Sequence, residues 1–293
     1  MKIAPMKIGK LCIGILCSLF LALAAHAGSP VWKVSQGDRH FFIGGTIHIL
    51  GESDYPLPRA FDQAYSKSDI LVFETDIQKS RDPKFSEMFM ARMVYPDNRT
   101  LKTLVTPGTF QALKIFTADR NIPVEAMNKF KPGLVLITLT QIEVERMGVG
   151  GTGVDEFFFS RAVRDGKPRQ HLEALEEQVA IFENLGVGDE DKLIAYILED
   201  LKRLPGLLPV IKTAWRAGDT PGLDRAILGP LKKDFPGLYQ TLFAARNQKW
   251  MTQLKRLAKT PGVEFVLVGA GHLAGDQGLL SQLKRQGFII TNQ

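Results

Sequence analysis

Two copies of a Gly-x-x-His pattern, one near each end of the chain, constrain the fold more than any other feature. The first, Gly45-Thr46-Ile47-His48, closes an apolar run at residues 41–47, and the second, Gly269-Ala270-Gly271-His272, follows the β-rich run at residues 264–268. An apolar, β-rich run that ends in small residues is typical of a buried parallel strand whose carboxyl end opens into a crevice. We therefore expect the two histidines to meet at one edge of a parallel sheet.

The first 27 residues have the pattern of a secretory signal peptide. Three lysines precede an apolar run from Leu11 to Ala25, and Ala25-His26-Ala27 forms a small-x-small cleavage pattern. The run is short for a transmembrane helix, and no later stretch is apolar enough to span a bilayer. We expect a periplasmic or secreted protein that begins near Gly28 and has no stable membrane span, with an uncleaved N-terminal anchor as the alternative.

Removing the signal peptide changes what charge and cysteine content imply. Lys2, Lys7 and Lys10 account for half of the formal charge of +6, and no cluster of basic residues is interleaved with aromatic residues, so we expect no nucleic-acid partner. Both cysteines, Cys12 and Cys17, also lie in the signal. The mature chain therefore has no disulfide, no thiolate ligand and no cysteine nucleophile.

The remaining pattern predicts one α/β domain over residues 28–293, with a mixed, centrally parallel sheet flanked by helices. Strands are expected at 31–34, 41–47, 69–73, 169–173, 264–268 and 288–291, and a helical insertion at about Pro83 to Arg164. Pro205 is expected to break or kink the helix through Leu201, with further helical stretches at 210–217 and 236–257. The loop at residues 148–153 fits Gly-x-Gly-x-x-Gly, but it follows a helical pattern, so we interpret it as a connection between helices.

Four predicted strands end in a residue that can bind a metal: His48, Glu74, Glu173 and His272. Ligands in open α/β sheets bind outside the carboxyl ends of the strands, so these four residues can converge. Two imidazoles and one or two carboxylates suit zinc, manganese, cobalt or iron(II), and a remaining carboxylate could act as general base on a metal-bound water. Sequence leaves open which carboxylate is the ligand and which is the base.

Each of these residues also has a structural interpretation. A single histidine after a strand is more often a core or capping residue, and Glu173 suits the first turn of a helix that begins near Ala174. Glu74 follows an apolar run, so its carboxylate needs either a metal or a basic partner. His40 and His171 lack comparable context and are assigned to structure or surface. Arg246 and Asn247 lie on a predicted helix, where an exposed pair is the default.

The order of short motifs along the mature chain resembles the TraB/GumN family. The resemblance covers nearly all of that chain and is carried by Gly45-Thr46-Ile47-His48, Phe73-Glu74, Gly153-Val154-Asp155, Leu172-Glu173 with Glu177-Gln178, Trp215 with Gly218-Asp219, Arg246-Asn247 and Gly269-Ala270-Gly271-His272-Leu273. The family is similar to the animal Tiki proteins, membrane-attached metalloproteases that use manganese or cobalt. Its wider superfamily includes erythromycin-esterase-like and haem-binding members.

The resemblance implies roles for individual residues. His48 and His272 become metal ligands, Glu74 becomes a ligand or base, and Glu173 becomes a second acidic position. Arg246 and Asn247 become candidates to orient a substrate carbonyl or carboxylate. The cofactor implied is a divalent ion, namely manganese, cobalt or zinc.

The residues together with the resemblance predict metal-dependent hydrolysis outside the cytoplasm, with a peptide bond as the leading candidate for the bond that is cleaved. Metal-bound water would be the nucleophile, with Glu74 or Glu173 as base and Arg246 or Asn247 as stabiliser. The alternative is a non-catalytic protein that binds or sequesters a peptide or haem in the same crevice. A third possibility, an accessory factor for export or polysaccharide assembly, has no support in these residues. Substrate, metal and oligomeric state stay open.

Overall fold

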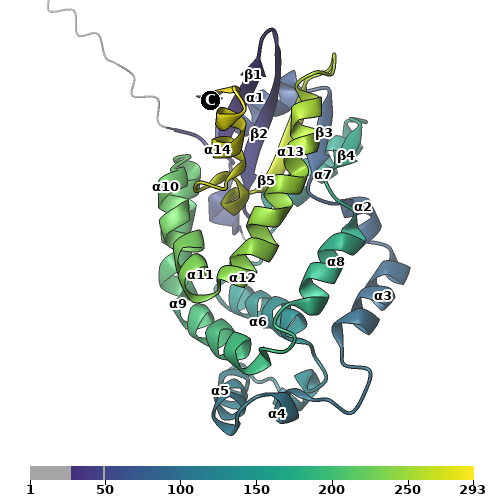
Figure 1. The fold of residues 1–293 in the computed structure, drawn as a ribbon, viewed down its shortest axis with the longest axis vertical. Helices are drawn as coiled ribbons and strands as arrows, with labels where there is room; N and C mark the ends of the chain where they lie inside the picture. Colours follow the sequence, from purple (N-terminus) through teal and green to yellow (C-terminus); the bar gives the residue numbers. More distant parts are fainter. Residues whose placement is uncertain (1–27, 49) are drawn as a thin grey trace, which may run out of the picture.

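The computed structural model describes residues 28–48 and 50–293. The predicted signal peptide, residues 1–27, lies outside the described residues. The described chain forms a six-stranded mixed sheet in the order β4-β3-β5-β2-β1-β6, with helices on both faces (Figure 1). The predicted α/β fold with a centrally parallel sheet is confirmed. The strands are β1 (Val31–Gln36), β2 (Arg39–Thr46), β3 (Ile70–Phe73), β4 (Arg169–His171), β5 (Glu264–Gly269) and β6 (Ile289–Asn292).

The four parallel strands bring their carboxyl ends to one edge of the sheet. β5 pairs with β2 on one side and with β3 on the other, and β4 pairs with β3. The register places Thr46 opposite Gly269, and Phe73 opposite both Leu267 and His171. β1 runs antiparallel to both of its neighbours, β2 and β6, and β6 is the edge strand on that side of the sheet. The chain segments that follow β2, β3, β4 and β5 therefore leave the sheet side by side.

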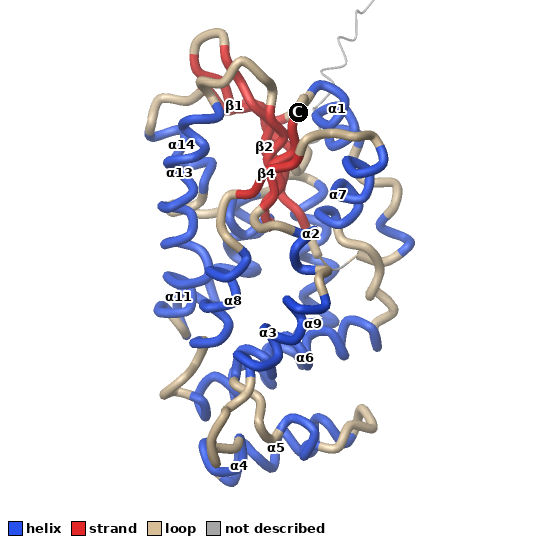
Figure 2. The backbone as a smooth tube through the Cα atoms, turned by 90° about the vertical axis from the view of Figure 1, so that its right-hand side faces the viewer, coloured by secondary structure: helices blue, strands red, loops and turns tan. Residues whose placement is uncertain are grey.

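Alternate residues of the strands pack against different helices. On one face Phe42, Phe73 and Phe265 contact α1 (Arg59–Lys67) and α7 (Val154–Arg164), and on the other Val266 and Val268 contact α13 (Ala245–Leu257) and α14 (Leu279–Arg285). Figure 2 shows the two helical layers on opposite sides of the strands. Each large apolar side chain buried in this way stabilises the fold by about 1.5–3 kcal/mol. The sheet edge is thus set in a rigid, close-packed support.

A third apolar cluster lies beyond the carboxyl edge of the sheet, in a purely helical region (Figure 1). It draws on α5, α6, α9 and the end of α8, so the predicted helical insertion is present, although its last helix, α7, packs on the sheet instead. The helices of this region are α3 (Pro83–Met93), α4 (Leu101–Leu104), α5 (Pro107–Ala118), η2 (Val124–Met127), α6 (Pro132–Arg146), α8 (Leu175–Asn184) and α9 (Glu190–Arg216). The short helices elsewhere are η1 (Glu52–Asp54), α2 (Ile77–Ser80), α10 (Thr220–Leu223), η3 (Asp224–Leu228), α11 (Gly229–Asp234), α12 (Pro236–Tyr239), η4 (Gln240–Ala244) and η5 (Ala270–Leu273). Within the described ranges, no helix has the length and apolar character needed to cross a bilayer.

Pro205 was predicted to break or kink its helix, and it does not break it, because α9 runs as one helix from Glu190 to Arg216 with Pro205 and Pro209 inside it. The two prolines remove N–H groups at positions four residues apart, which leaves two helical carbonyls without their usual donors. These are the carbonyls of Leu201 and Pro205, each four residues before a proline. The Thr213 hydroxyl adds a further hydrogen bond of 2.9 Å, to the carbonyl of Pro209. Buried residues on both sides of Pro205, such as Leu201 and Leu208, hold the helix in place.

The predicted helix at 236–257 is present but contains an irregular turn. Residues 240–244 form a π-helical turn between α12 and α13, directly before Arg246 and Asn247. A π turn inserts an extra residue into a helix and often lies at a functional site, because it re-aims the side chains that follow. The structural interpretation of the sequence made Arg246 and Asn247 an exposed pair on a helix, but both side chains point inward.

Glu264, the first residue of β5, gives the fold a pH-dependent weak point. Its side chain is buried, Oε1 accepts a hydrogen bond from the Thr260 hydroxyl, and Oε2 has no partner within the described residues. Burial raises the pKa of this carboxyl, so its charged form is disfavoured in the folded chain. The Glu264 carboxyl therefore costs the fold no stability below its unfolded-state pKa of ~4.3. The cost grows as the pH rises from there through the raised folded-state pKa.

Glu264→Gln is therefore expected to raise the free energy of unfolding by on the order of 1 kcal/mol at pH 8. The gain should shrink as the pH falls toward 4.5, because the raised pKa increases the neutral fraction of the wild-type carboxyl in the folded state. Urea unfolding at both pH values measures the difference, and Glu125→Gln, at an exposed carboxylate, is the control. A gain of equal size at both pH values would contradict this account.

Candidate active site

His48 leaves the end of β2 in a position fixed by the loop that precedes α7. The N–H of Val154 donates to the carbonyl of Ile47 at 3.1 Å, and Gly153 lies against the main chain of His48. A Cβ at position 153 would lie 2.8 Å from the Cα of His48, so only glycine permits this approach. The glycine-rich loop at residues 148–153 joins α6 to α7, as predicted, and it also positions His48.

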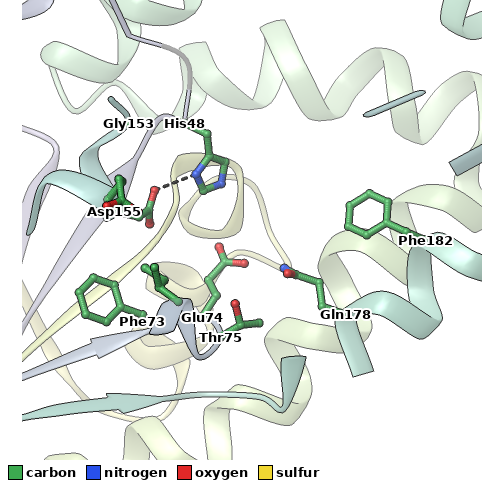
Figure 3. A pocket seen from close by; sticks show the side chains of 10 residues that line it. His48, Phe73, Glu74, Thr75, Gly153, Asp155, Gln178 and Phe182 are labelled. Carbon is green, nitrogen blue, oxygen red and sulfur yellow. Dashed lines mark ion pairs between the residues drawn. The ribbon is translucent and has the colours of Figure 1, made fainter. Parts of the chain in front are cut away.

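The same loop brings Asp155, in the first turn of α7, to His48. The Nδ1 of His48 lies 2.8 Å from Oδ2 of Asp155 (Figure 3). The His48 side chain is 68% exposed and that of Asp155 is 13% exposed, so the imidazole faces open space while its anchor is largely buried. The charge of Asp155 raises the pKa of His48 to about 9, against the opposing effect of desolvation. Nε2 of His48 is left for other chemistry.

Glu74 follows β3 and is held at both of its oxygens. Oε1 accepts a hydrogen bond from the N–H of Gly269 at 2.7 Å, and Oε2 accepts one from Nη2 of Arg246 at 2.6 Å. Burial alone would raise the pKa of Glu74, but the charges of Arg246 and His48 and the hydrogen bond from the Gly269 N–H hold it below its usual range. Glu74 is therefore a fixed negative charge at the floor of the site.

Arg246 lies at the centre of a buried cluster, and all five of its N–H groups are engaged. Nε donates to Glu173, Nη2 donates to Glu74 and Glu173 at 2.6 Å each, and Nη1 donates to the carbonyl of Leu242 and to Nε2 of His272. The sequence suggested that Arg246 orients the substrate. In this arrangement it has no N–H left for a substrate and instead positions Glu74.

His272 is neutral, and its hydrogen bonds identify the tautomer. Arg246 can only donate, so Nε2 of His272, 3.0 Å from Nη1, accepts and the proton is on Nδ1. Nδ1 then donates to Oδ1 of Asn247 at 2.6 Å, while the Asn247 amide donates to the carbonyls of His272 and Gln277. Burial lowers the pKa of His272 to about 3, which agrees with a neutral ring. Asn247, expected to face a substrate, orients His272 instead.

Glu173 is buried more deeply than its partner Arg246 or Glu74. Its side chain is 2% exposed, and besides Arg246 it accepts a hydrogen bond from Nε1 of Trp250 at 3.1 Å. Its position precedes Ala174, the N-cap of α8, so it is not a first-turn carboxylate of that helix. Glu173 does not reach the cavity that His48 and Glu74 share, and its place as an alternative base is not supported by this geometry.

His48 and Glu74 face each other across one cavity of about 390 Å³, which we call the site cavity (Figure 3). Asp155, Gln178 and Phe182, none of them among the predicted site residues, also contribute to its wall. The full lining is His48, Phe73, Glu74, Thr75, Ile77, Gly153, Asp155, Glu156, Gln178 and Phe182. Gly153-Val154-Asp155 and Glu177-Gln178 were the available signals for Asp155 and Gln178, because both belong to the motifs that carry the family resemblance.

The predicted metal ligands His48, Glu74 and His272 do not form a three-ligand site in this arrangement. Over residues 28–48 and 50–293, no three histidine, cysteine, aspartate or glutamate side chains are grouped so that they could hold an ion. Glu74 Oε1 lies 3.8 Å from Nε2 of His272, but both side chains bind the guanidinium of Arg246, which supplies the positive charge at that point. The residues as placed therefore do not fit the ion, and metal dependence stays a prediction.

Fold and site together define an α/β protein in which two Gly-x-x-His segments follow adjacent parallel strands and flank a buried Glu-Arg-Glu cluster. The chain belongs to the TraB/PrgY/gumN family, whose model matches residues 30–292. It is similar to the uncharacterized protein YbaP of Escherichia coli strain K12, with 25% identity over 85% of this chain and 89% of that protein. It is also similar to YbaP of Shigella flexneri, with 24% identity over the same shares. No solved structure gives a significant match.

Proposed function

We propose that the protein is a hydrolase that cleaves peptide bonds in the periplasm or outside the cell. The observation that carries the proposal is the His48–Asp155 pair, 2.8 Å apart, which faces the ionised Glu74 across the site cavity. A carboxylate that holds Nδ1 of a histidine fixes the tautomer and leaves Nε2 for proton transfer. This pair is joined to a cavity that can admit a peptide segment or a small molecule.

The proposed reaction uses His48 as the proton carrier. The reaction requires the neutral imidazole of His48, which the raised pKa of about 9 makes the minor form at pH 7, so the rate is expected to rise with pH up to about 9. Nε2 of this neutral form accepts a proton from a water molecule as that water attacks the carbonyl carbon, and the same nitrogen then donates the proton to the leaving amine. Asp155 stabilises the imidazolium that forms between these two steps. Glu74 is ionised throughout, so it can accept a hydrogen bond from the attacking water and orient it.

The sequence predicted a divalent ion (manganese, cobalt or zinc), and measurement of the metal content tests this prediction. His48 and Glu74 could contribute to such a site, but His272 could join them only if Arg246 were displaced from its imidazole. We therefore derive no step through an ion. The buried ion pairs of Arg246 with Glu74 and Glu173 make that displacement costly.

The test begins with the protein from Gly28 onward and a tryptic digest of casein, with the disappearance of peptides followed by mass spectrometry. We expect turnover by the wild type, loss of at least about 100-fold in His48→Ala and Glu74→Gln, and wild-type rates in the control His40→Ala. Assays with EDTA, with added manganese, cobalt or zinc, and with measured metal content decide the ion. Binding of casein peptides without cleavage would overturn the hydrolase and support the non-catalytic alternative.

A further inference from the structure

β4 is one of the two outermost strands of the sheet. It pairs with β3, the strand that Glu74 follows. The strand order puts β4 outside β3, and all three of its residues are exposed (Figure 1). In a parallel pair, alternate residues direct their N–H and C=O groups at the neighbouring strand. Leu71 donates to the carbonyl of Pro168, and Leu172 donates to the carbonyl of Phe73, so residues 168, 170 and 172 face β3.

The main-chain groups of Arg169 and His171 consequently point away from the sheet. Among the described residues, neither the N–H nor the carbonyl of these two positions has a hydrogen-bond partner. Such an edge is a template for an added strand. With three residues it is too short for a stable sheet between two copies of the chain, but it can align a peptide that is also held elsewhere.

A second cavity, of about 280 Å³, lies along this edge, and we call it the edge cavity. It is lined by the three residues of β4 together with residues of the segment that follows β3. Phe73, Thr75 and Ile77 line both the edge cavity and the site cavity, so the two cavities adjoin at these three residues. A chain placed along β4 leads toward the carboxyl edge of the sheet, where the site cavity opens.

We infer that β4 binds an extended peptide by main-chain pairing at Arg169 and His171 and that this pairing feeds the peptide into the site cavity. The inference rests on the proposed function, because it names the substrate as an extended segment of at least several residues. Recognition through main-chain groups tolerates many sequences. Arg169 donates to the carbonyl of Lys167 and lies over the ring of Phe159, and among the described residues it forms no ion pair, so its charge favours acidic side chains on the peptide. His171, which the sequence assigned to structure or surface, here supplies a binding position.

Binding is measured first, in a His48→Ala background, so that the result does not depend on turnover. The probe is a fluorescein-labelled ten-residue peptide of alternating threonine and glutamate, read by fluorescence anisotropy. His171→Pro deletes an outward N–H without touching the bonds to β3, while His171→Ala keeps that N–H and is the matched control. We expect His171→Pro to bind at least tenfold more weakly than His171→Ala, and the probe N-methylated at alternate residues to lose binding to both.

Equal affinities in the two variants, or no binding by any protein, would overturn the inference. If His171→Pro fails to fold by circular dichroism, Arg169→Pro against Arg169→Ala makes the same comparison. Light scattering shows whether the wild type forms a dimer that His171→Pro abolishes, which would assign the edge to a second copy instead. A separate turnover experiment compares casein peptides with a dipeptide amide. Absence of turnover of both substrates by the wild type refutes the hydrolase. A KM that His171→Pro raises for the long peptides but not for the dipeptide amide supports the pairing.

Discussion

Arg246→Met is expected to lower the free energy of unfolding by about 3–5 kcal/mol, the largest effect of any single substitution considered for this chain. The guanidinium, 11% exposed, holds Glu74 and Glu173 at 2.6 Å each, and both carboxylates are largely buried. Methionine fills a similar volume but leaves two negative charges without a partner. Glu173 cannot turn to solvent, because it lies among Trp250 and Arg246, whereas Glu74 lines the site cavity but keeps its hydrogen bond from the Gly269 N–H.

The measurement is urea unfolding at pH 7 of the wild type, Arg246→Met, Glu173→Gln and the double variant. Because the arginine and the glutamate form one cluster, the double variant should lose clearly less than the sum of the two single losses. Arg246→Lys is the conservative control: it keeps the charge with three donors in place of five, and it should recover part of the stability. Additive losses across the cycle would show that Arg246 acts through packing and not through the carboxylates.

The fold was predictable from sequence because its signals are local. Continuous apolar runs such as residues 265–268 belong to strands buried on both faces, and the ends of these strands place His48, Glu74 and His272 at one edge of the sheet. Helix starts such as Thr106-Pro107 carry their own capping residues. Each of these features depends on neighbours within a few positions, which is the range over which periodicity and capping can be read.

The hydrogen bonds and ion pairs of the site were not predictable, because they join residues that are far apart in the sequence. Arg246 and Glu74 are 172 positions apart, and nothing in the helical pattern around Arg246 indicates that a π turn aims it inward. The same holds for Asp155, which meets His48 only because Gly153 lets the loop touch the end of β2. Sequence therefore indicated which residues could be ligands, but it could not indicate that a guanidinium lies between them.

Asp155 offers the sharpest test of how the site works. Asn at this position has nearly the same shape but no charge, and it can present its amide to Nδ1 of His48, which favours the wrong tautomer. Asp155→Asn is expected to lower kcat for casein peptides by about 10²–10⁴-fold. Because the Asp155 charge raises the pKa of His48, its loss should also lower the free energy of unfolding at pH 7, and this effect should disappear above pH 9. Glu156→Gln, which alters a neighbour that lines the same cavity without touching His48, should keep wild-type rates.

A second readout separates orientation from general damage to the site. The Asp155 charge raises the pKa of His48 to about 9, so its loss should return that pKa toward the ordinary value near ~6.5. Titration of the His48 ring proton by NMR measures the change, and the pH at which residual activity rises should fall by a similar interval. A lower pKa alone would leave more neutral, base-competent imidazole at pH 7 and speed the reaction. A drop in kcat together with a drop in pKa therefore assigns Asp155 to holding the tautomer and stabilising the imidazolium, whereas unchanged kcat would remove the His48–Asp155 pair from the mechanism.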